Sequence, residues 1–188
     1  ESEQGGFHPI DQAEKRRGGF VELAGIKRIG KTIFTGAIAY NNQKELERVW
    51  NSTLFLSPTN PFVVGDSVQG SYRKEQFVLE GSFTTPIQRK WHFGLATHYR
   101  VASSSKDSDP RPESRGMRFN IVPGVSYHTS RWSLGASASY ERLSESVAYT
   151  VVKTHETHQL FLFRGLGIYT GKQASGFYRS YQGNRWGT

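Results

Sequence analysis

The side chains with the greatest potential for chemistry are histidines within strand-like segments. His92 and His98 fall in one alternating stretch, His128 closes another, and His155 and His158 form the most closely spaced pair. Imidazole is a common zinc ligand, but a zinc site needs about four donors that converge on one point. The spacing here gives no such convergence. We therefore predict no metal site and interpret the histidines as hydrogen-bonded polar side chains.

Carboxylates and glycine-rich segments give no catalytic constellation. Glu80 and Glu141 are expected on the polar side of their strands, without a nucleophile and a base at a recognisable spacing. The segments GDSVQG and RGLGIYTG lack the strand-to-helix context that a phosphate-binding loop requires. We expect no catalytic residue, no cofactor-binding residue and no enzyme activity. A membrane-embedded hydrolase is a weaker alternative.

Composition limits the elements that can carry these residues. The chain has 188 residues, of which 13% are aromatic, and it has 20 glycines and no cysteine. No run of about 18 apolar residues occurs, which excludes a membrane-spanning helix, whereas a transmembrane strand needs only about ten residues of alternating type. The net charge of +8 raises nucleic acid as a partner. The charges are scattered, with Lys15, Arg16 and Arg17 the tightest cluster, so we expect no nucleic-acid partner.

Alternation with a period of two predicts six strands. Successive side chains of a strand point to opposite faces, so one apolar row and one polar row indicate a strand with two different surroundings. The segment KWHFGLATHYRV shows this pattern most clearly. We predict an N-terminal arm at 1–18 and one β-domain at 19–188, with strands near 19–28, 31–41, 70–84, 90–101, 116–128 and 131–141.

Short and long connections alternate along the chain. The tight turns RIGK, TPIQR and HTSR alternate with long polar segments at 42–69, 102–115 and 142–185, which is typical of outer-membrane barrels. The last segment contains either two more strands or a structured outward loop, with a seventh strand starting near Trp186. Its weaker alternation favours the loop. Pro123 has no N–H to donate, which predicts a bulge or a locally unpaired partner.

The positions of the aromatic residues bear on the medium that contacts the apolar rows. Trp and Tyr favour membrane interfaces, where the ring lies in an apolar layer and its N–H or O–H stays hydrated. Aromatic pairs eight residues apart span about 20 Å along the membrane normal, close to the apolar band of roughly 25 Å. We predict a lipid-facing girdle of Phe34, Tyr40, Phe77, Phe83, Trp91, Tyr99, Phe119, Tyr127, Trp132 and Tyr140. The lumen-facing candidates are His92, His98, Arg100, Arg118, Asn120 and Ser126.

These patterns predict an all-β fold, an antiparallel up-and-down transmembrane β-barrel. A soluble β-barrel or sandwich that binds a small ligand or glycan is the alternative. Strands of soluble proteins also favour Tyr, Phe and Trp, so the aromatic content alone does not decide between the two.

Several segments, taken in order, carry a resemblance. IGKTIFTGAIAYNN, NPFVVGDSVQGSYRKEQFVLEGSF, DPRPES and FNIVPGVSYHTSRWSLGASASYE resemble an uncharacterised family of outer-membrane β-barrel proteins from Bacteroidota. The resemblance covers roughly residues 19–188, and the DPRP loop is its most specific part. It implies a bacterial outer-membrane location and a barrel larger than this chain supplies. A barrel without open edges needs at least about eight strands.

The expected function follows from this resemblance. We expect a non-enzymatic, porin-like outer-membrane barrel, either a channel or an accessory subunit of a nutrient-uptake or secretion complex. Outer-membrane lipid is the expected surrounding, and a TonB-dependent transporter with a surface lipoprotein is the expected partner. The long connections would make the contacts, because loops on a rigid scaffold usually carry recognition.

Overall fold

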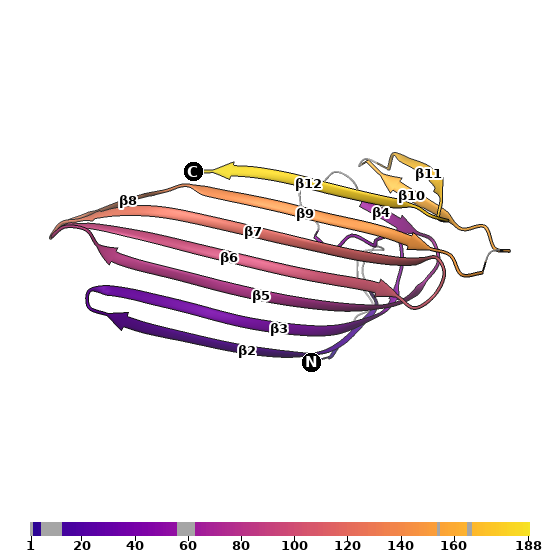
Figure 1. The fold of residues 1–188 in the computed structure, drawn as a ribbon, viewed down its shortest axis with the longest axis horizontal. Coiled ribbons are helices and arrows are strands. Elements are labelled where there is room, and N and C mark those ends of the chain that lie inside the picture. Colours follow the sequence, from indigo (N-terminus) through magenta and orange to yellow (C-terminus); the bar gives the residue numbers. More distant parts are fainter. Residues whose placement is uncertain (1, 5–12, 56–62, 154, 165–166) are drawn as a thin grey trace.

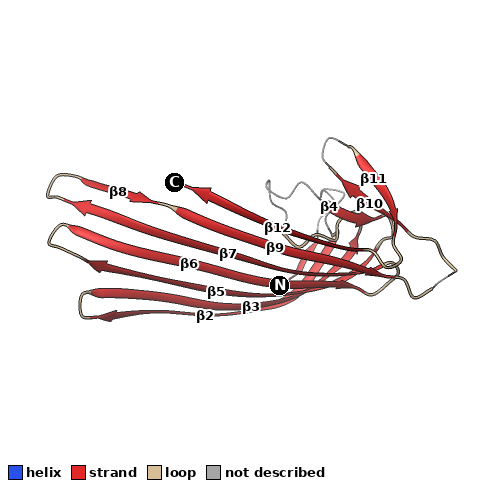
Figure 2. Cartoon of the chain, turned by 45° about the horizontal axis from the view of Figure 1, so that its top comes forward, coloured by secondary structure: helices blue, strands red, loops and turns tan. Residues whose placement is uncertain are grey.

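The computed structural model describes residues 2–4, 13–55, 63–153, 155–164 and 167–188. Their regular structure consists of antiparallel β-strands, which form one large sheet and one small sheet (Figures 1 and 2). No helix in this part of the chain is long and apolar enough to cross a membrane. The predicted all-β antiparallel class is confirmed.

The large sheet, here the main sheet, is a meander in which each long strand pairs with the next one. In order across the sheet, the long strands are β2 (Lys15–Ile29), β3 (Thr32–Arg48), β5 (Gly70–Pro86), β6 (Trp91–Lys106), β7 (Arg111–His128), β9 (Ser139–Thr150) and β12 (Tyr178–Gly187). The short strand β1 (Ser2–Gln4) pairs with the start of β2, and β8 (Ser133–Ser137) pairs with the end of β7.

The small sheet, here the accessory sheet, lies at one end of the main sheet (Figure 1). It contains β4 (Val63–Asp66), β10 (Gln159–Phe163) and β11 (Tyr169–Gln173), in the order β11-β10-β4. Val64 and Leu160 pack against Val147 and Tyr149 of β9. This end of the main sheet is therefore covered by residues from two of the chain's connections.

The strand register divides the main sheet into two chemically different faces. One row across four strands contains Tyr40, Phe77, Val101 and Met117 on a single face. We call this face, from that row to the short turns, the apolar belt. The next row on the same face, one step toward the accessory sheet, is polar throughout: Asn42, Glu75, Ser103 and Arg115. The apolar belt therefore ends abruptly and in register. The opposite face of the main sheet is called the polar face.

The strands extend further than the sequence predicts. β3 continues to Arg48 and β6 to Lys106, whereas β7 already begins at Arg111. The predicted loop at 102–115 is therefore wrong, since only residues 107–110 connect the two strands. Much of the predicted loop at 42–69 is also strand. Beyond the apolar belt both faces are polar or covered by other parts of the chain. Backbone pairing continues there without the alternation that marks a strand in the sequence.

The predicted outward loop at 142–185 is also wrong in large part. β9 runs on to Thr150, and the seventh long strand begins at Tyr178 rather than near Trp186. At the other end, Lys15–Gly18 belong to β2 and not to the predicted arm. Most of that arm (1 and 5–12), part of the predicted 42–69 loop (56–62) and residues 154 and 165–166 lie outside the described residues.

Pro123 marks the one interruption in the pairing of β7 with its later neighbour. β7 pairs with β9 through residues 111–121 and with β8 through residues 124–128. The carbonyl of Pro123 accepts the N–H of Ala138 at 3.1 Å, so the position of the missing N–H falls at the break between β8 and β9. The predicted locally unpaired partner is confirmed.

The two edges of the main sheet do not meet in the described residues. β12 pairs there with β9, and β2 pairs with β3 and the three residues of β1. No described strand joins β12 to β2. This part of the chain is therefore an open curved wall, and closure into a barrel stays a prediction.

Candidate functional site

The polar face carries a groove lined by residues of β2, β3, β5, β6 and β7. Its volume is about 710 Å³, and small residues such as Ala24, Gly36 and Ala96 line much of it. Glu80 and His98 supply charged or titratable groups, and Asn120 an amide. The groove is thus open and lined mainly by small and apolar residues, and Glu80, His98 and Asn120 form one polar row across it.

Cross-strand pairs organise the polar side chains of this face. Glu80 Oε1 lies 2.8 Å from His98 Nδ1, across β5 and β6. Arg118 donates through Nε and Nη2 to Glu141 Oε2 at 2.9 and 2.6 Å, across β7 and β9. Arg118 is thereby neutralised, whereas Arg100, opposite it in register, keeps a shielded Nε with no hydrogen-bond partner in the described part of the chain.

The register places all six lumen-facing candidates on the polar face, as three direct pairs between β6 and β7. These pairs are His92 with Ser126, His98 with Asn120, and Arg100 with Arg118. His92 also lies edge to face with His128, with ring centres 5.0 Å apart. No three His, Asp or Glu side chains of the described residues gather into a possible metal site.

The ten girdle candidates lie on the opposite face, in contact with one another in several places. Ring centres are 4.8 Å apart for Trp91 and Tyr127, and 5.5 Å for Tyr127 and Trp132. Sequence reasoning did not include Trp186 in the girdle. Its ring centre lies 4.6 Å from that of Tyr140, and the residue is 77% exposed. Its strand, β12, falls in the region where alternation is weak. The face is uncovered in the described structure, and contact with lipid stays a prediction.

A short segment crosses the polar face next to the accessory sheet, and we call residues 50–55 the cap segment. The N–H groups of Trp50 and Ser52 donate to the carbonyls of Asp66 and Val64 at 2.9 and 2.8 Å. Glu145 of β9 accepts the N–H of Leu54 at 2.7 Å and that of the following residue at 3.2 Å. The cap segment is therefore fixed both to β4 and to the main sheet.

Buried side chains on the polar face of the main sheet also contact the cap segment. Leu54 and Phe55 pack against Ala102 and Leu143 of the main sheet. Ser114 Oγ donates to the carbonyl of Ser52 at 2.5 Å. These contacts close the polar face at the end that carries the accessory sheet, while the groove near the middle stays open.

Two tyrosines bind the hydroxyl of Ser52 in the same region. Tyr149 donates to Ser52 Oγ at 2.8 Å, and Ser52 Oγ lies 3.2 Å from the hydroxyl of Tyr72. Burial raises the pKa of both tyrosine hydroxyls, so both stay protonated and able to donate at neutral pH. The sequence gives no sign of this network, because its three members come from three separate segments.

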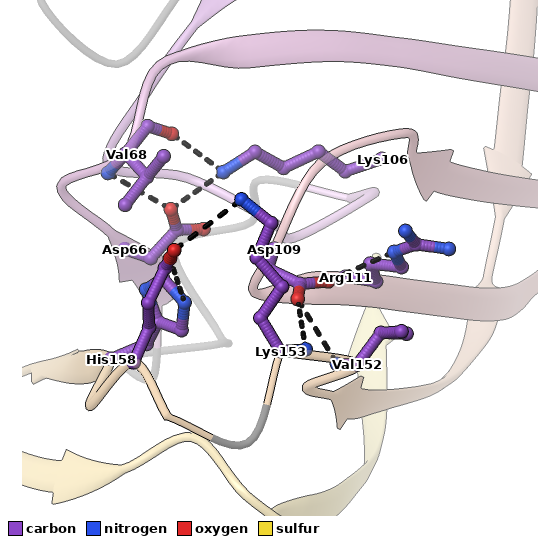
Figure 3. Close-up of polar contacts among 9 residues, drawn as sticks. Asp66, Val68, Lys106, Asp109, Arg111, Val152, Lys153 and His158 are labelled. Carbon is purple, nitrogen blue, oxygen red and sulfur yellow. Dashed lines mark hydrogen bonds and ion pairs between the residues drawn. The ribbon is translucent and has the colours of Figure 1, made fainter.

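A buried ion pair joins β4 to the end of β6 (Figure 3). Lys106 Nζ lies 2.6 Å from Asp66 Oδ1, and the two side chains are 0% and 1% exposed. Lys106 also donates to the carbonyl of Val68 at 2.5 Å, and Asp66 Oδ1 accepts the N–H of Val68 at 3.0 Å. Burial raises the pKa of Asp66 and lowers the pKa of Lys106, while the hydrogen bond between them acts in the opposite direction for each.

Replacing Gly65 is expected to dislodge the cap segment. A Cβ at this position would overlap the carbonyl group of Trp50, whose backbone lies directly against β4. We expect Gly65→Ala to lower the free energy of unfolding by about 2 kcal/mol, since overpacking forces backbone shifts. Urea titration measures the loss. Gly171→Ala in β11, where a Cβ meets nothing within 4 Å, is the matched control. Equal stability of the two variants would contradict this account of the cap segment.

Asp109 makes the connection after β9 sensitive to acid. Its Oδ2 accepts the N–H groups of Val152 and Lys153 at 3.0 and 2.8 Å, and its Oδ1 accepts Nε of Arg111 at 2.9 Å (Figure 3). These hydrogen bonds, that of Lys153 foremost, lower the pKa of Asp109 below its usual 3.8. Because the pKa of Asp109 is lower in the folded protein than in the unfolded chain, its carboxylate stabilises the fold when the pH is above the unfolded-state pKa. This stabilisation is lost as the pH falls through the folded-state pKa.

Amide exchange at Val152 and Lys153 is therefore expected to accelerate sharply below about pH 3.8. The measurement is hydrogen exchange followed by mass spectrometry, with rates corrected for intrinsic pH dependence. Asp109→Asn is expected to exchange faster at neutral pH and to lose this acid dependence. An unchanged Asp109→Asn profile would show that the carboxylate does not hold the connection.

Together these features define an all-β protein with one antiparallel main sheet, an uncovered apolar belt and a polar face capped at one end. The chain belongs to the family of unknown function designated DUF6850, whose sequence profile matches residues 1–188. Searches of curated proteins and of solved structures gave no significant match.

Proposed function

We propose that this chain forms part of the wall of a transmembrane β-barrel in the bacterial outer membrane. The barrel acts without catalysis, as a channel or as an accessory subunit of a nutrient-uptake or secretion complex. The observation that carries this proposal is the apolar belt, which has no cover in the described structure while the polar face is the capped one. A soluble sheet protein would bury the apolar face and expose the polar face.

Exposure and dimensions support lipid as the medium. Leu23 is 72% exposed, Leu134 is 63% exposed, and neither belongs to a buried cluster of the described residues. Water-soluble monomers rarely expose contiguous apolar patches larger than a few hundred Å². Along β5 the apolar belt runs from Phe77 to Thr85. In a barrel with tilted strands this length spans about 20 Å along the membrane normal, close to the roughly 25 Å of an outer-membrane apolar band.

The open edges follow from the same proposal. Unpaired N–H and C=O groups are not tolerated in hydrocarbon, so β2 and β12 pair with further strands in the membrane. The polar face then lines the lumen, and the cap segment with the accessory sheet narrows one mouth. A TonB-dependent transporter with a surface lipoprotein is the proposed partner, on the strength of the sequence resemblance.

Detergent dependence tests the proposal. The intact protein, refolded from denaturant, is expected to be monodisperse in detergent micelles and aggregated in plain buffer, as judged by size-exclusion chromatography with light scattering. In vesicles, a protease added outside is expected to leave the strands protected. A monodisperse protein in plain buffer would reject membrane insertion and would favour a soluble β-barrel or sandwich.

A further inference from the structure

Three short turns of the main sheet lie at the same end, opposite the accessory sheet, whereas the short connection at 107–110 lies at the other end (Figure 1). They connect β2 to β3, β5 to β6, and β7 to β8. Residues 27–33, 86–92 and 128–134 contain six Lys or Arg residues and no Asp or Glu. We call these six the basic rim: Lys27, Arg28, Lys31, Arg89, Lys90 and Arg131, all of them exposed.

The basic rim is not neutralised by the protein in the described structure. None of its six members has a carboxylate within ion-pair distance among the described residues. At the opposite end of the sheet, by contrast, Arg111 pairs with Asp109 and Lys153 with Glu156. The charge of the short-turn end is therefore available to an external anion.

The basic rim adjoins the aromatic end of the apolar belt. Trp91 and Trp132 are 43% and 51% exposed, and both flank Tyr127. Backbone hydrogen bonds hold this arrangement: His128 N–H donates to the carbonyl of Lys90 at 2.9 Å, and Thr129 N–H donates to that of Trp132 at 2.9 Å. Along the strands toward the short turns, the aliphatic part of the apolar belt is therefore followed by the aromatic rings and then by the cations of the basic rim.

We propose that the basic rim binds anionic phospholipid headgroups in the leaflet that the short turns enter, a proposal that rests on the membrane location proposed above. The side chains change from apolar to aromatic to cationic along the strands toward the short turns. A lipid bilayer matches this order, because its hydrocarbon core is followed by an interface that favours Trp and Tyr and then by phosphate groups. Long Lys and Arg side chains reach that level with their methylene stems along apolar surface. Phosphatidylglycerol, with a net negative charge, is favoured over zwitterionic phosphatidylcholine.

Fluorescence quenching of the intact protein in bilayers tests this inference. The protein is reconstituted in phosphatidylcholine that contains a minor fraction of either brominated phosphatidylglycerol or brominated phosphatidylcholine. A basic residue at an anionic surface strengthens binding about fivefold, so the relative binding constant of phosphatidylglycerol is expected near five. Trp91→Phe with Trp132→Phe is expected to remove the excess quenching, which localises it to the short-turn end.

The decisive comparison uses two sets of four substitutions. Neutralising four of the six basic-rim residues by Lys31→Gln, Arg89→Gln, Lys90→Gln and Arg131→Gln is expected to lower the relative binding constant from about five toward one. The matched control neutralises four exposed cations nearer the accessory sheet, by Lys44→Gln, Arg73→Gln, Arg164→Gln and Lys172→Gln, and is expected to leave it unchanged.

The possible failures are distinguishable. If brominated phosphatidylcholine quenches the tryptophans but brominated phosphatidylglycerol does so no better, the protein is inserted and the lipid preference is rejected. If the control set abolishes the preference as fully as the rim set, the preference comes from net charge and the basic rim is not its site. If neither brominated lipid quenches any variant, the protein is outside the bilayer, and the proposed membrane location fails as well.

Discussion

Lys106→Met is expected to destabilise the fold by about 3–5 kcal/mol, because it leaves the Asp66 carboxylate buried without a counter-ion. The remaining N–H of Val68 satisfies one carboxylate oxygen, and the other has no hydrogen-bond partner even in the native protein's described residues. Loss of the lysine also removes a hydrogen bond to the carbonyl of Val68. Denaturant titration of the intact protein in detergent measures the effect.

The destabilisation by Lys106→Met is expected to depend on pH. Burial already raises the pKa of Asp66 from its usual 3.8, and without the lysine it rises further. A raised pKa means that the folded state binds the proton more tightly than the unfolded chain does. The variant is therefore expected to be most stable below about pH 3.8 and to lose stability as the pH rises.

A double variant separates the buried charge from the loss of packing. Lys106→Met combined with Asp66→Asn keeps an acceptor for the N–H of Val68 and removes the charge, so it is expected to recover most of the lost stability. It is also expected to lose the pH dependence. If the double variant were no more stable than Lys106→Met, the lysine would act through its hydrogen bond and its packing beside Tyr72, and the ion-pair account would be wrong.

The sequence predicts the fold best where one face of a strand is apolar. In β6 and β7 the alternation locates the strands and the side of each residue, because every second side chain meets a different medium. Past the apolar belt this signal ends, although the strands continue. There the polar face is covered by the chain itself: Glu145 binds the backbone of Leu54, 91 residues earlier. No local pattern reports a contact of that range.

The same reasoning explains which site residues the sequence could indicate. Arg100 and Arg118 follow from parity alone, once their strands are known. Asp66 and Lys106 do not, because an isolated Asp after VVG and a Lys after SSS look like ordinary turn residues. Their importance comes from complete burial, which only the packing of the accessory sheet against the main sheet produces.

Leu79→Arg is expected to impair membrane insertion strongly if the apolar belt faces lipid. Leu79 lies in the belt between Ile38 and Tyr99 and is 44% exposed. On the surface of a soluble protein such a change is usually within about 0.5 kcal/mol of neutral. An Arg on the lipid face of a transmembrane barrel costs about 2–4 kcal/mol near the bilayer midplane. Equilibrium folding into vesicles measures this difference.

Two controls tie the effect of Leu79→Arg to hydrocarbon. Leu79→Ala removes the same packing without a charge and is expected to cost less. Ser105→Arg adds the same charge to the same face beyond the belt boundary, between Arg73 and Glu113 in register, and is expected to be nearly neutral. Equal stability of all three variants would show that the belt is exposed to water. A selective loss for Leu79→Arg, larger in vesicles than in detergent, requires a bilayer, because only there is the guanidinium kept from water by a layer of fixed thickness.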